Sequence, residues 1–535
     1  MNSAKNKLIR IEEVALRPDD DETILKARIS QILGLPEKEI ISYSIVKKNI
    51  DSRQKRNILF VYSLDVKVKD IKAIKKFDSR HRVRVHEPFV YQIKKITKKI
   101  NKKIIVVGSG PCGLFAALLL AKAGLKPLLI ERGKDIDARV KDVDNFFQTG
   151  SLNPQSNIQF GEGGAGTFSD GKLYTLINDP RSKYIFTELI KAGAPPEIAW
   201  SGTPHIGTDK LRGVIKNIRK EIIKLGGKIK FETCLTDLEI EQKKIKAIIV
   251  NNKTRIAVDD LILATGHSAR DTYQMLYNHQ LKIQAKAFAI GLRIEHQAEM
   301  INKSQYGAFY QHPKLGPAKY KLVQHSAGLR SVYTFCMCPG GYVMAAASEE
   351  GGVVTNGMSE YAQDGKNSNS ALLVPVMPSD FSSQHPLAGI EFQRKWEGRA
   401  YLAGGRDYSA PAQLVGDFLQ GRASKEMKSV KPSYRPKVKF TSLDSCLPDY
   451  VITSLRTALP LMDNKIKGFA HPEAILVGVE TRSSSPVRLE RDEKCESSIA
   501  GIYPAGEGAG YAGGIVSSAI DGLTVAEALI VKYTK

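Results

Sequence analysis

The spacing of apolar and polar residues predicts a small mixed domain at the start of the chain. Strands with period-two alternation are expected at 8–16, 40–48, 57–66 and 81–86, and helices at 20–33 and 70–77. The order βαββαβ is typical of a ferredoxin-like arrangement. We therefore expect residues 1–95 to form a ferredoxin-like α+β domain.

After Lys103 the pattern changes to that of an α/β domain. A short apolar strand at 104–107, a glycine-rich turn, an apolar helix at 114–123 and a strand at 127–130 follow one another. Another buried strand is expected at 261–266, and residues 501–529 return to strand, glycine cluster and helix. We expect one α/β domain from 103–283 and 480–535, interrupted by a largely β substrate domain at 284–479.

The first glycine motif of the α/β domain predicts a dinucleotide site. Gly108-Ser109-Gly110-Pro111-Cys112-Gly113 has GxGxxG spacing between a strand and a helix. Its glycines permit a tight turn, close approach of a pyrophosphate and close helix–strand packing. Glu131, followed by Arg132, ends the next strand 18 residues after Gly113, near the spacing of an acid that binds ribose hydroxyls. An adenosine without a 2′-phosphate is expected.

The same spacing recurs in two other segments, Gly161–Gly166 and Gly508–Gly513. Only the first motif combines a strand, a helix and a second-strand acid. Spacing by itself therefore does not separate a nucleotide loop from a structural glycine turn, and the context does.

Later segments resemble the glutathione-reductase-like Rossmann flavoproteins. Ala264-Thr265-Gly266 is similar to their ATG segment, and residues 501–508 are similar to their late strand and the acid that follows. In that family this acid is an aspartate that contacts the ribitol of FAD; here Glu507 follows Gly506 instead. The resemblance implies that Gly513-Gly514-Ile515 begin a helix whose N-terminus stabilises negative charge on the flavin.

The chain resembles still more closely an uncharacterised family of FAD-dependent dehydrogenases, the NAD(FAD)-utilizing dehydrogenases. The similarity lies in Gln159–Lys172, Phe335–Gly341, Asn356–Ser359 and Glu480–Pro486. It implies bound FAD and a redox role on an unidentified substrate. Gly163, Gly164, Ala165 and Lys172 are then expected to offer N–H groups and an ammonium beside the cofactor.

Five residues are candidates for catalysis, each with a structural alternative: Lys172, His267, Cys336, Cys338 and Arg482. Lys172 stands near the flavin or binds a carbonyl or phosphate. His267 is an acid or base, or is structural. Cys336 and Cys338 exchange electrons with the flavin, or lie in a strand facing a core. Arg482 binds a substrate carboxylate, or braces the domain junction.

The sequence leaves two sources of electrons for the flavin open. There is no second unit of strand, GxGxxG, helix and acid, so a dedicated NAD(P)H domain is not expected. Either NADH or NADPH visits the flavin transiently, or the substrate reacts with the flavin directly.

Length and composition favour a cytoplasmic protein of two or three domains. The chain has 535 residues, and its apolar runs are far shorter than the roughly 20 residues of a membrane span. The first residues contain no apolar stretch typical of a secretory signal. Six scattered cysteines, without zinc spacing, indicate a reducing compartment and no metal site.

Charge suggests a partner for the first domain. The net charge is +23, and residues 1–103 hold 26 Lys and Arg against 13 Asp and Glu. Weak binding of nucleic acid or an acidic partner, or simply a solvated basic surface, would explain this. Besides an FAD-dependent oxidoreductase, two hypotheses stay open: a flavin-dependent RNA-modifying or RNA-binding protein, and a non-catalytic module on the FAD fold.

Overall fold

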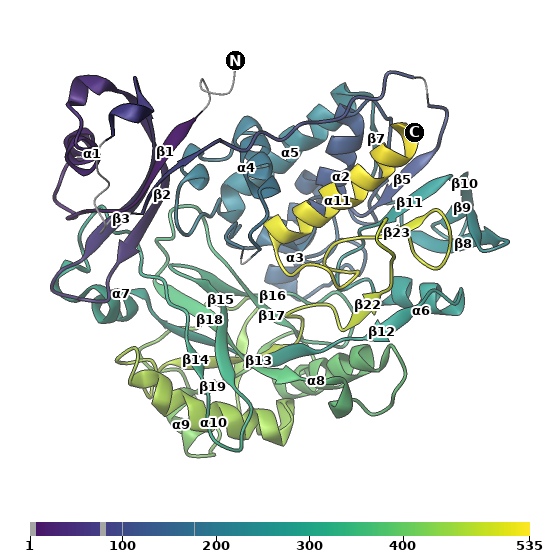
Figure 1. Cartoon of the computed structure of the whole chain (residues 1–535). Helices are drawn as coiled ribbons and strands as arrows, with labels where there is room; N and C mark the ends of the chain where they lie inside the picture. The colour runs from purple at the N-terminus through teal and green to yellow at the C-terminus, as the bar shows by residue number, and fades with distance from the viewer. Residues whose placement is uncertain (1–6, 75–81, 99, 176, 535) are drawn as a thin grey trace.

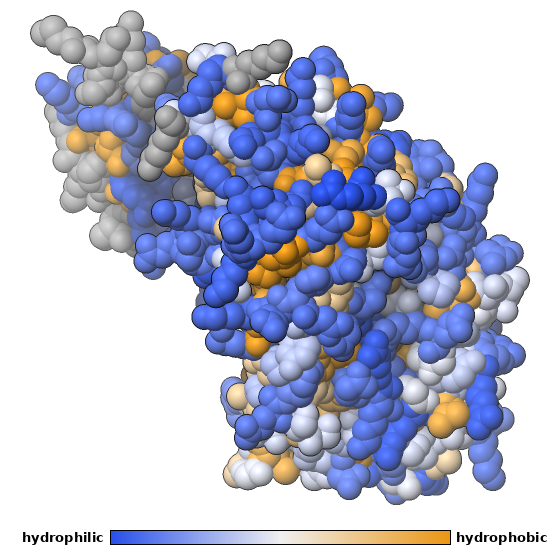
Figure 2. Space-filling view, turned by 90° about the vertical axis from the view of Figure 1, so that its right-hand side faces the viewer, coloured by the Kyte–Doolittle hydropathy of each residue, from blue (hydrophilic) through white to orange (hydrophobic). Residues whose placement is uncertain are grey.

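The computed structural model describes residues 7–74, 82–98, 100–175 and 177–534. Figure 1 shows three groups of elements: an N-terminal sheet in purple, a parallel sheet with its helices, and a larger sheet in green tones below it. None of the helices in these ranges is long and apolar enough to cross a membrane. Hydrophilic residues cover most of the face seen in Figure 2, with apolar residues in small groups between them.

The N-terminal part of the chain forms a four-stranded antiparallel sheet. Its antiparallel order is β2-β3-β1-β4, and α1 covers one face. The elements are β1 (Leu8–Leu16), η2 (Glu22–Ile24), α1 (Leu25–Leu33), η3 (Glu37–Glu39), β2 (Ile40–Asp51), β3 (Leu59–Val68), η4 (Ile71–Ala73) and β4 (Val83–His86).

One helix prediction in this part needs correction, and another lies partly outside the described residues. The helix expected at 20–33 is a short 3-10 turn followed by α1, because Asp21 caps the turn by accepting from the Thr23 N–H. The helix expected at 70–77 is described only as η4, and its second half lies outside the described residues.

The parallel sheet is a doubly wound Rossmann-type sheet. Its order is β23-β11-β5-β6-β7, so the strand order reverses beside β5. The strands are β5 (Ile104–Val107), β6 (Leu128–Ile130), β7 (Lys228–Lys230), β11 (Asp260–Leu263) and β23 (Ile502–Pro504). The strand expected at 261–266 thus ends at Leu263. Ligands of such sheets bind outside the carboxyl ends of the strands at this reversal.

Both faces of the parallel sheet are covered, which explains its unbroken apolar strands. Ile104 and Val106 pack with α2 and α11, whereas Ile105 and Val107 pack with the meander β8–β10. The covering elements are α2 (Pro111–Lys122), α3 (Ile136–Thr149), η5 (Ala165–Phe168), α4 (Arg181–Lys191), η6 (Pro196–Ala199), α5 (Thr208–Lys224), β8 (Leu235–Glu241), β9 (Lys244–Val250), β10 (Thr254–Ala257), α6 (Arg270–Asn278) and α11 (Ile515–Thr534).

The inserted segment contains a seven-stranded sheet of order β14-β15-β18-β13-β21-β19-β20. The chain enters and leaves it through the paired strands β12 (Ile283–Ala285) and β22 (Val487–Leu489). Its strands are β13 (Phe288–Gln297), β14 (Val323–Gln324), β15 (Val332–Cys338), β18 (Asn367–Val376), β19 (Ala410–Leu414), β20 (Val438–Phe440) and β21 (Ile475–Glu480), with a hairpin of β16 (Tyr342–Ala345) and β17 (Thr355–Met358).

The inserted segment holds more helix than its sequence suggested. Its helical elements are α7 (Ala298–Tyr306), η7 (Gly307–Phe309), η8 (Pro378–Asp380), α8 (Ala388–Gly404), α9 (Val415–Leu419), η9 (Asp444–Cys446) and α10 (Asp449–Asp463). Helix α8 contains Gly389 and Gly398, and α10 contains Pro460. Glycine and proline oppose helix formation by local propensity, and burial against the sheet outweighs them.

Candidate functional site

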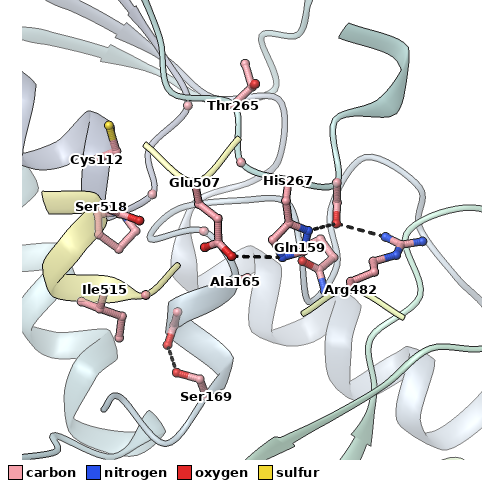
Figure 3. A pocket seen from close by; sticks show the side chains of 18 of the residues that line it. Cys112, Gln159, Ala165, Ser169, Thr265, His267, Arg482, Glu507, Ile515 and Ser518 are labelled. Carbon is pink, nitrogen blue, oxygen red and sulfur yellow. Dashed lines mark hydrogen bonds and ion pairs between the residues drawn. The ribbon is translucent and has the colours of Figure 1, made fainter. Parts of the chain in front are cut away.

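A cavity lies at the carboxyl ends of the parallel strands and brings most predicted site residues together (Figure 3). The predicted residues that line it are Gly108, Gly110, Pro111, Cys112, Glu131, Arg132, Gly164, Ala165, Lys172, Thr265, Gly266, His267, Cys336, Arg482, Glu507, Gly513, Gly514 and Ile515. The predicted residues outside the lining are Ser109, Gly113, Gly163, Cys338 and Gly506.

The first glycine loop has the geometry that its motif requires. Gly108 has φ +99° and its N–H donates to the Ile130 carbonyl at 2.8 Å. A Cβ at Gly108 would collide with the Ala264 carbonyl, and one at Gly113 with the Gly108 carbonyl. Pro111 begins α2, and Gly110, Pro111 and Cys112 line the cavity, so the N-terminus of α2 adjoins it and favours an anion there.

The second glycine segment packs directly on the first loop. The Gly163 N–H donates to the Ser109 carbonyl at 3.0 Å. Arg139 of α3 is fully buried, and burial lowers its pKa to about 9. Its guanidinium donates to the carbonyls of Asn157, Ile158, Gly161, Glu162 and Gly164. The Arg139 side chain therefore holds the backbone of the second glycine segment, which contains no β-strand.

Sequence reasoning did not single out Arg139, although a signal existed. It shares the buried side of α3 with Ile136, Val143 and Phe146. An arginine in an apolar stripe at helical spacing indicates a buried guanidinium with fixed partners.

Glu131 joins the first two glycine segments. Its carboxylate accepts from the Ser109 N–H and hydroxyl, both at 2.8 Å, and from the Gly133 and Gly161 N–H groups, both at 3.0 Å. Arg132 pairs with Asp271 at 2.9 Å. Both side chains line the cavity, and contact of Glu131 with a ribose stays a prediction.

The third glycine segment closes the cavity from the other side. The Gly506 N–H donates to Asp521 of α11 at 2.6 Å, and Asp521 also pairs with Arg491. A Cβ at Gly508 would collide with the backbone of Gly266, so this segment lies against the ATG loop. Helix α11 begins at Ile515, and its N-terminus faces the cavity as the resemblance implied.

Glu507 and His267 face each other on the cavity wall, with 4.0 Å between Glu507 Oε1 and His267 Nε2 (Figure 3). Burial raises the pKa of Glu507 to about 7, and the charge of Lys286 opposes this rise. Burial, with Arg482 and Arg270 nearby, lowers the pKa of His267 to about 3. At neutral pH His267 is therefore uncharged, and Glu507 is the group that titrates.

Arg482 is occupied by protein groups. It donates to Glu397 at 3.1 and 2.9 Å, to the Ser268 hydroxyl at 3.1 Å and to the Ser348 hydroxyl at 2.5 Å. Arg270 also binds Glu397. These contacts favour bracing of the junction over capture of a substrate carboxylate.

Lys172 belongs to a buried polar cluster beside the cavity. Its Nζ lies 3.2 Å from Asp170 Oδ2 and 3.3 Å from Cys338 Sγ. Burial opposes the charge of Lys172, but the Asp170 carboxylate outweighs it and raises the pKa of Lys172. Lys172 is thus a permanent cation, and Cys338 lies behind it, away from the cavity.

Cys336 lines the cavity in a strained backbone conformation. It has φ +42° within an irregularity of β15, and Arg293 donates to its carbonyl at 3.2 Å. Burial raises the pKa of the Cys336 thiol to about 12, which leaves it protonated at neutral pH. Arg293 itself pairs with buried Glu480 at 2.6 Å.

Several lining residues had no role assigned from the sequence. Those that fall in the family-like motifs include Gln159, Phe160, Asp170, Phe335, Asn356 and Glu480, and those outside the motifs include Tyr174 and Ser268. The motifs predicted the segments, and only the fold shows which of their side chains line the cavity.

Three family descriptions match the chain, and the second and third overlap at residues 287–303. "Domain of unknown function" matches residues 8–67, "Pyridine nucleotide-disulphide oxidoreductase" residues 102–303, and "FAD-dependent protein, C-terminal domain-like" residues 287–483. Fold and cavity together define a Rossmann-type flavoprotein, in line with the predicted fold class.

A relative of matching length extends this assignment. An uncharacterized protein of Clostridium beijerinckii is 49% identical over 532 residues, 98% of this chain and 99% of that protein. The similarity thus includes the N-terminal sheet as well as the parallel sheet and the inserted segment. The chain therefore belongs to the same family as that protein, a family of FAD-dependent oxidoreductases.

Solved structures are similar at a much lower level. CtdE in complex with FAD has a TM-score of 0.32 and 11% identity, covering 80% of this chain and 84% of that one. The flavin-dependent brominase Bmp2 has a TM-score of 0.37 and 11% identity, covering 81% and 79%. These TM-scores are too low for either likeness to bear on function.

Proposed function

We propose that this protein transfers hydride between FAD held in the described cavity and an unidentified small molecule. One observation supports this most strongly. Three glycine-rich segments and the N-termini of α2 and α11 meet in one cavity, whose opposite wall comes from the inserted sheet. Such an arrangement suits an anionic, elongated cofactor with a reactive end under a cap.

The residues of the cavity fit FAD. The first turn of α2 would hold the diphosphate, Glu131 the ribose, and Gly513 to Ile515 the flavin. A Cβ at Gly513 would meet no atom within 4 Å, so open space adjoins the N-terminus of α11. FAD would supply the hydride chemistry when bound.

Around the proposed flavin position the chain contributes a cation, a neutral imidazole and side chains of the inserted segment that line the cavity. Lys172 keeps its charge because Asp170 holds it, and His267 stays uncharged at neutral pH. Phe335 and Asn356 from the inserted segment line the cavity, as does Tyr174, which is 51% exposed. Tyr174 marks the side from which a substrate would enter.

NADH or NADPH is proposed as a transient reductant. Within the described ranges the chain has one parallel sheet, and its reversal point is already the FAD position.

The cytoplasm is the proposed compartment, because all six cysteines are free thiols.

The experiment is anaerobic reduction of the FAD-bound protein, followed by the visible absorbance of the flavin. NADH, NADPH and a panel of small metabolites are mixed with it in turn. The proposal expects at least one donor to bleach the flavin with saturable kinetics. Purified protein that contains no flavin and takes up no FAD on titration would refute it.

A further inference from the structure

The atoms of His267 and Glu507 that face the cavity have no hydrogen-bond partner among the described residues. His267 Nε2 and Glu507 Oε1 are 4.0 Å apart, beyond hydrogen-bond distance. The other side of the His267 ring is firmly held, since Nδ1 lies 3.0 Å from the Ser268 hydroxyl. Whether Nδ1 carries the ring hydrogen therefore determines whether Nε2 is a hydrogen-bond acceptor or a donor toward a ligand.

The direction of the hydrogen bonds at Ser268 follows from Arg482. A guanidinium can only donate, so the Ser268 oxygen accepts from Arg482 Nη1 at 3.1 Å. The Ser268 oxygen has two side-chain contacts among the described residues, and only His267 Nδ1 can accept the hydroxyl hydrogen, so this hydrogen donates to Nδ1. A neutral imidazole has one donor and one acceptor nitrogen, so Nδ1 accepts and Nε2 bears the hydrogen. Figure 3 shows this row of contacts from Arg482 to Glu507.

The surroundings also keep His267 uncharged. The guanidinium groups of Arg482 and Arg270 both lie close enough to disfavour a second positive charge. Glu397 holds both arginines in place, and all three side chains are buried. His267 is thus prevented from acting as a base at either nitrogen.

The protonation of Glu507 depends on a different set of neighbours. The groups that face it are His267, Lys286, whose charge favours the carboxylate, and Tyr273, whose hydroxyl donates to the Gly508 carbonyl at 2.8 Å. The preceding residue, Gly506, packs against Cys112 of the first glycine loop. Glu507 therefore lies next to the loop that the proposed function gives to the diphosphate.

We propose that Ser268 and Arg482 fix His267 as the neutral Nε2–H tautomer, a positioned donor to the cavity, and that Glu507 takes up a proton when an anionic ligand binds. The second half rests on the proposed function, which makes FAD that ligand. A dianionic diphosphate disfavours a nearby carboxylate, so binding shifts Glu507 toward its neutral form.

The tautomer is tested on the apoprotein by NMR with ¹⁵N-labelled histidine, with His267→Asn to assign the signals. The proposal expects a protonated Nε2, a bare Nδ1 and no titration between pH 5 and 9. Ser268→Ala should give a mixture of tautomers. The control Ser348→Ala removes another acceptor of Arg482 without touching His267, and should leave the spectrum unchanged. A protonated Nδ1, or titration near neutrality, would overturn the first half.

Proton uptake is measured by calorimetric titration of the apoprotein with FAD in buffers of different ionisation enthalpy. At pH 7 a carboxyl whose pKa is about 7 is half protonated, so uptake of about half a proton is expected. FAD affinity should fall as pH rises through 7. Glu507→Gln should abolish both effects, and uptake that persists in this variant would overturn the second half.

The two proposals fail in different ways. If the wild-type apoprotein does not bind FAD, the proposed function falls and proton uptake at Glu507 falls with it. The histidine spectra of the apoprotein involve no FAD, so they decide the tautomer of His267 in either case.

Discussion

Among single residues, burial sets the chemistry available at the cavity. Cys336 and Cys338 are close in sequence, yet Cys336 faces the cavity while Cys338 lies behind Lys172. Burial raises the pKa of both thiols, that of Cys336 to about 12. Because the thiolate is the reactive form, neither cysteine is prepared for exchange with a flavin at neutral pH.

We expect Cys336 to be nearly inert toward thiol reagents in the native protein. A thiol whose pKa is about 12 has a roughly thousandfold smaller thiolate fraction than an ordinary cysteine. The rate of reaction with a chromogenic disulfide should be compared between wild type and Cys336→Ser. Equal native rates are expected, and a fast phase that vanishes in the variant would contradict the assignment.

Sequence predicts some of these residues and misses others for a physical reason. Gly108 and Gly113 are recognisable because a motif of six residues encodes their local geometry. The neutrality of His267 depends on burial and then on the charge of Arg482, and both arise only through the fold. Local spacing therefore predicts residues that line the cavity, but it does not assign their protonation states.

At the level of elements, the second glycine segment owes its shape to α3. Arg139 donates to three carbonyls of the segment and to two carbonyls just before it, and the planar fork of its guanidinium matches their arrangement. The periodicity of α3 was accessible from the sequence, but the partners of Arg139 were not. The helices α8 and α10 were missed because glycine and proline weaken their local signal.

Arg139→Lys should therefore destabilise the protein strongly. A lysine has three donors at one point, so several buried carbonyls lose their partner at about 1–3 kcal/mol each. We expect a loss of about 3 kcal/mol or more in the free energy of unfolding, measured by urea denaturation. The matched variant Arg255→Lys, at an exposed pair with Glu239, should change it by less than about 1 kcal/mol. Equal effects of the two substitutions would refute this role.

In the whole molecule, Glu397 joins parts that are far apart in the chain. It lies on α8 of the inserted segment and binds Arg270 of α6 and Arg482, where the chain returns. Changes in the spacing of apolar and polar residues predict the order along the chain of the N-terminal sheet, the parallel sheet and the inserted sheet. The docking of the N-terminal sheet was not, since it uses main-chain bonds of Lys48 with Trp200 and Gly202 at 2.8 and 2.9 Å.

Glu397→Gln should loosen the junction of the two larger units. It removes the countercharge shared by two buried guanidinium groups, at a cost of about 3–5 kcal/mol. Glu391→Gln on the same helix is the control, because its partner Arg394 is solvent-exposed, and its effect should stay below about 1 kcal/mol. Thermal unfolding followed by circular dichroism compares them. A midpoint for Glu397→Gln as high as that of wild type would count against this role.

The central claim is that FAD occupies the cavity formed by the three glycine-rich segments. FAD titration of apoprotein by flavin fluorescence, with wild type, Gly110→Val and Gly213→Ala, tests it most directly. Gly213 lies on α5, where an added Cβ would meet no atom within 4 Å, whereas Gly110 caps α2 at the cavity. We expect at least about tenfold weaker binding for Gly110→Val, near 1.4 kcal/mol, and unchanged binding for Gly213→Ala. Undiminished binding by Gly110→Val would contradict it.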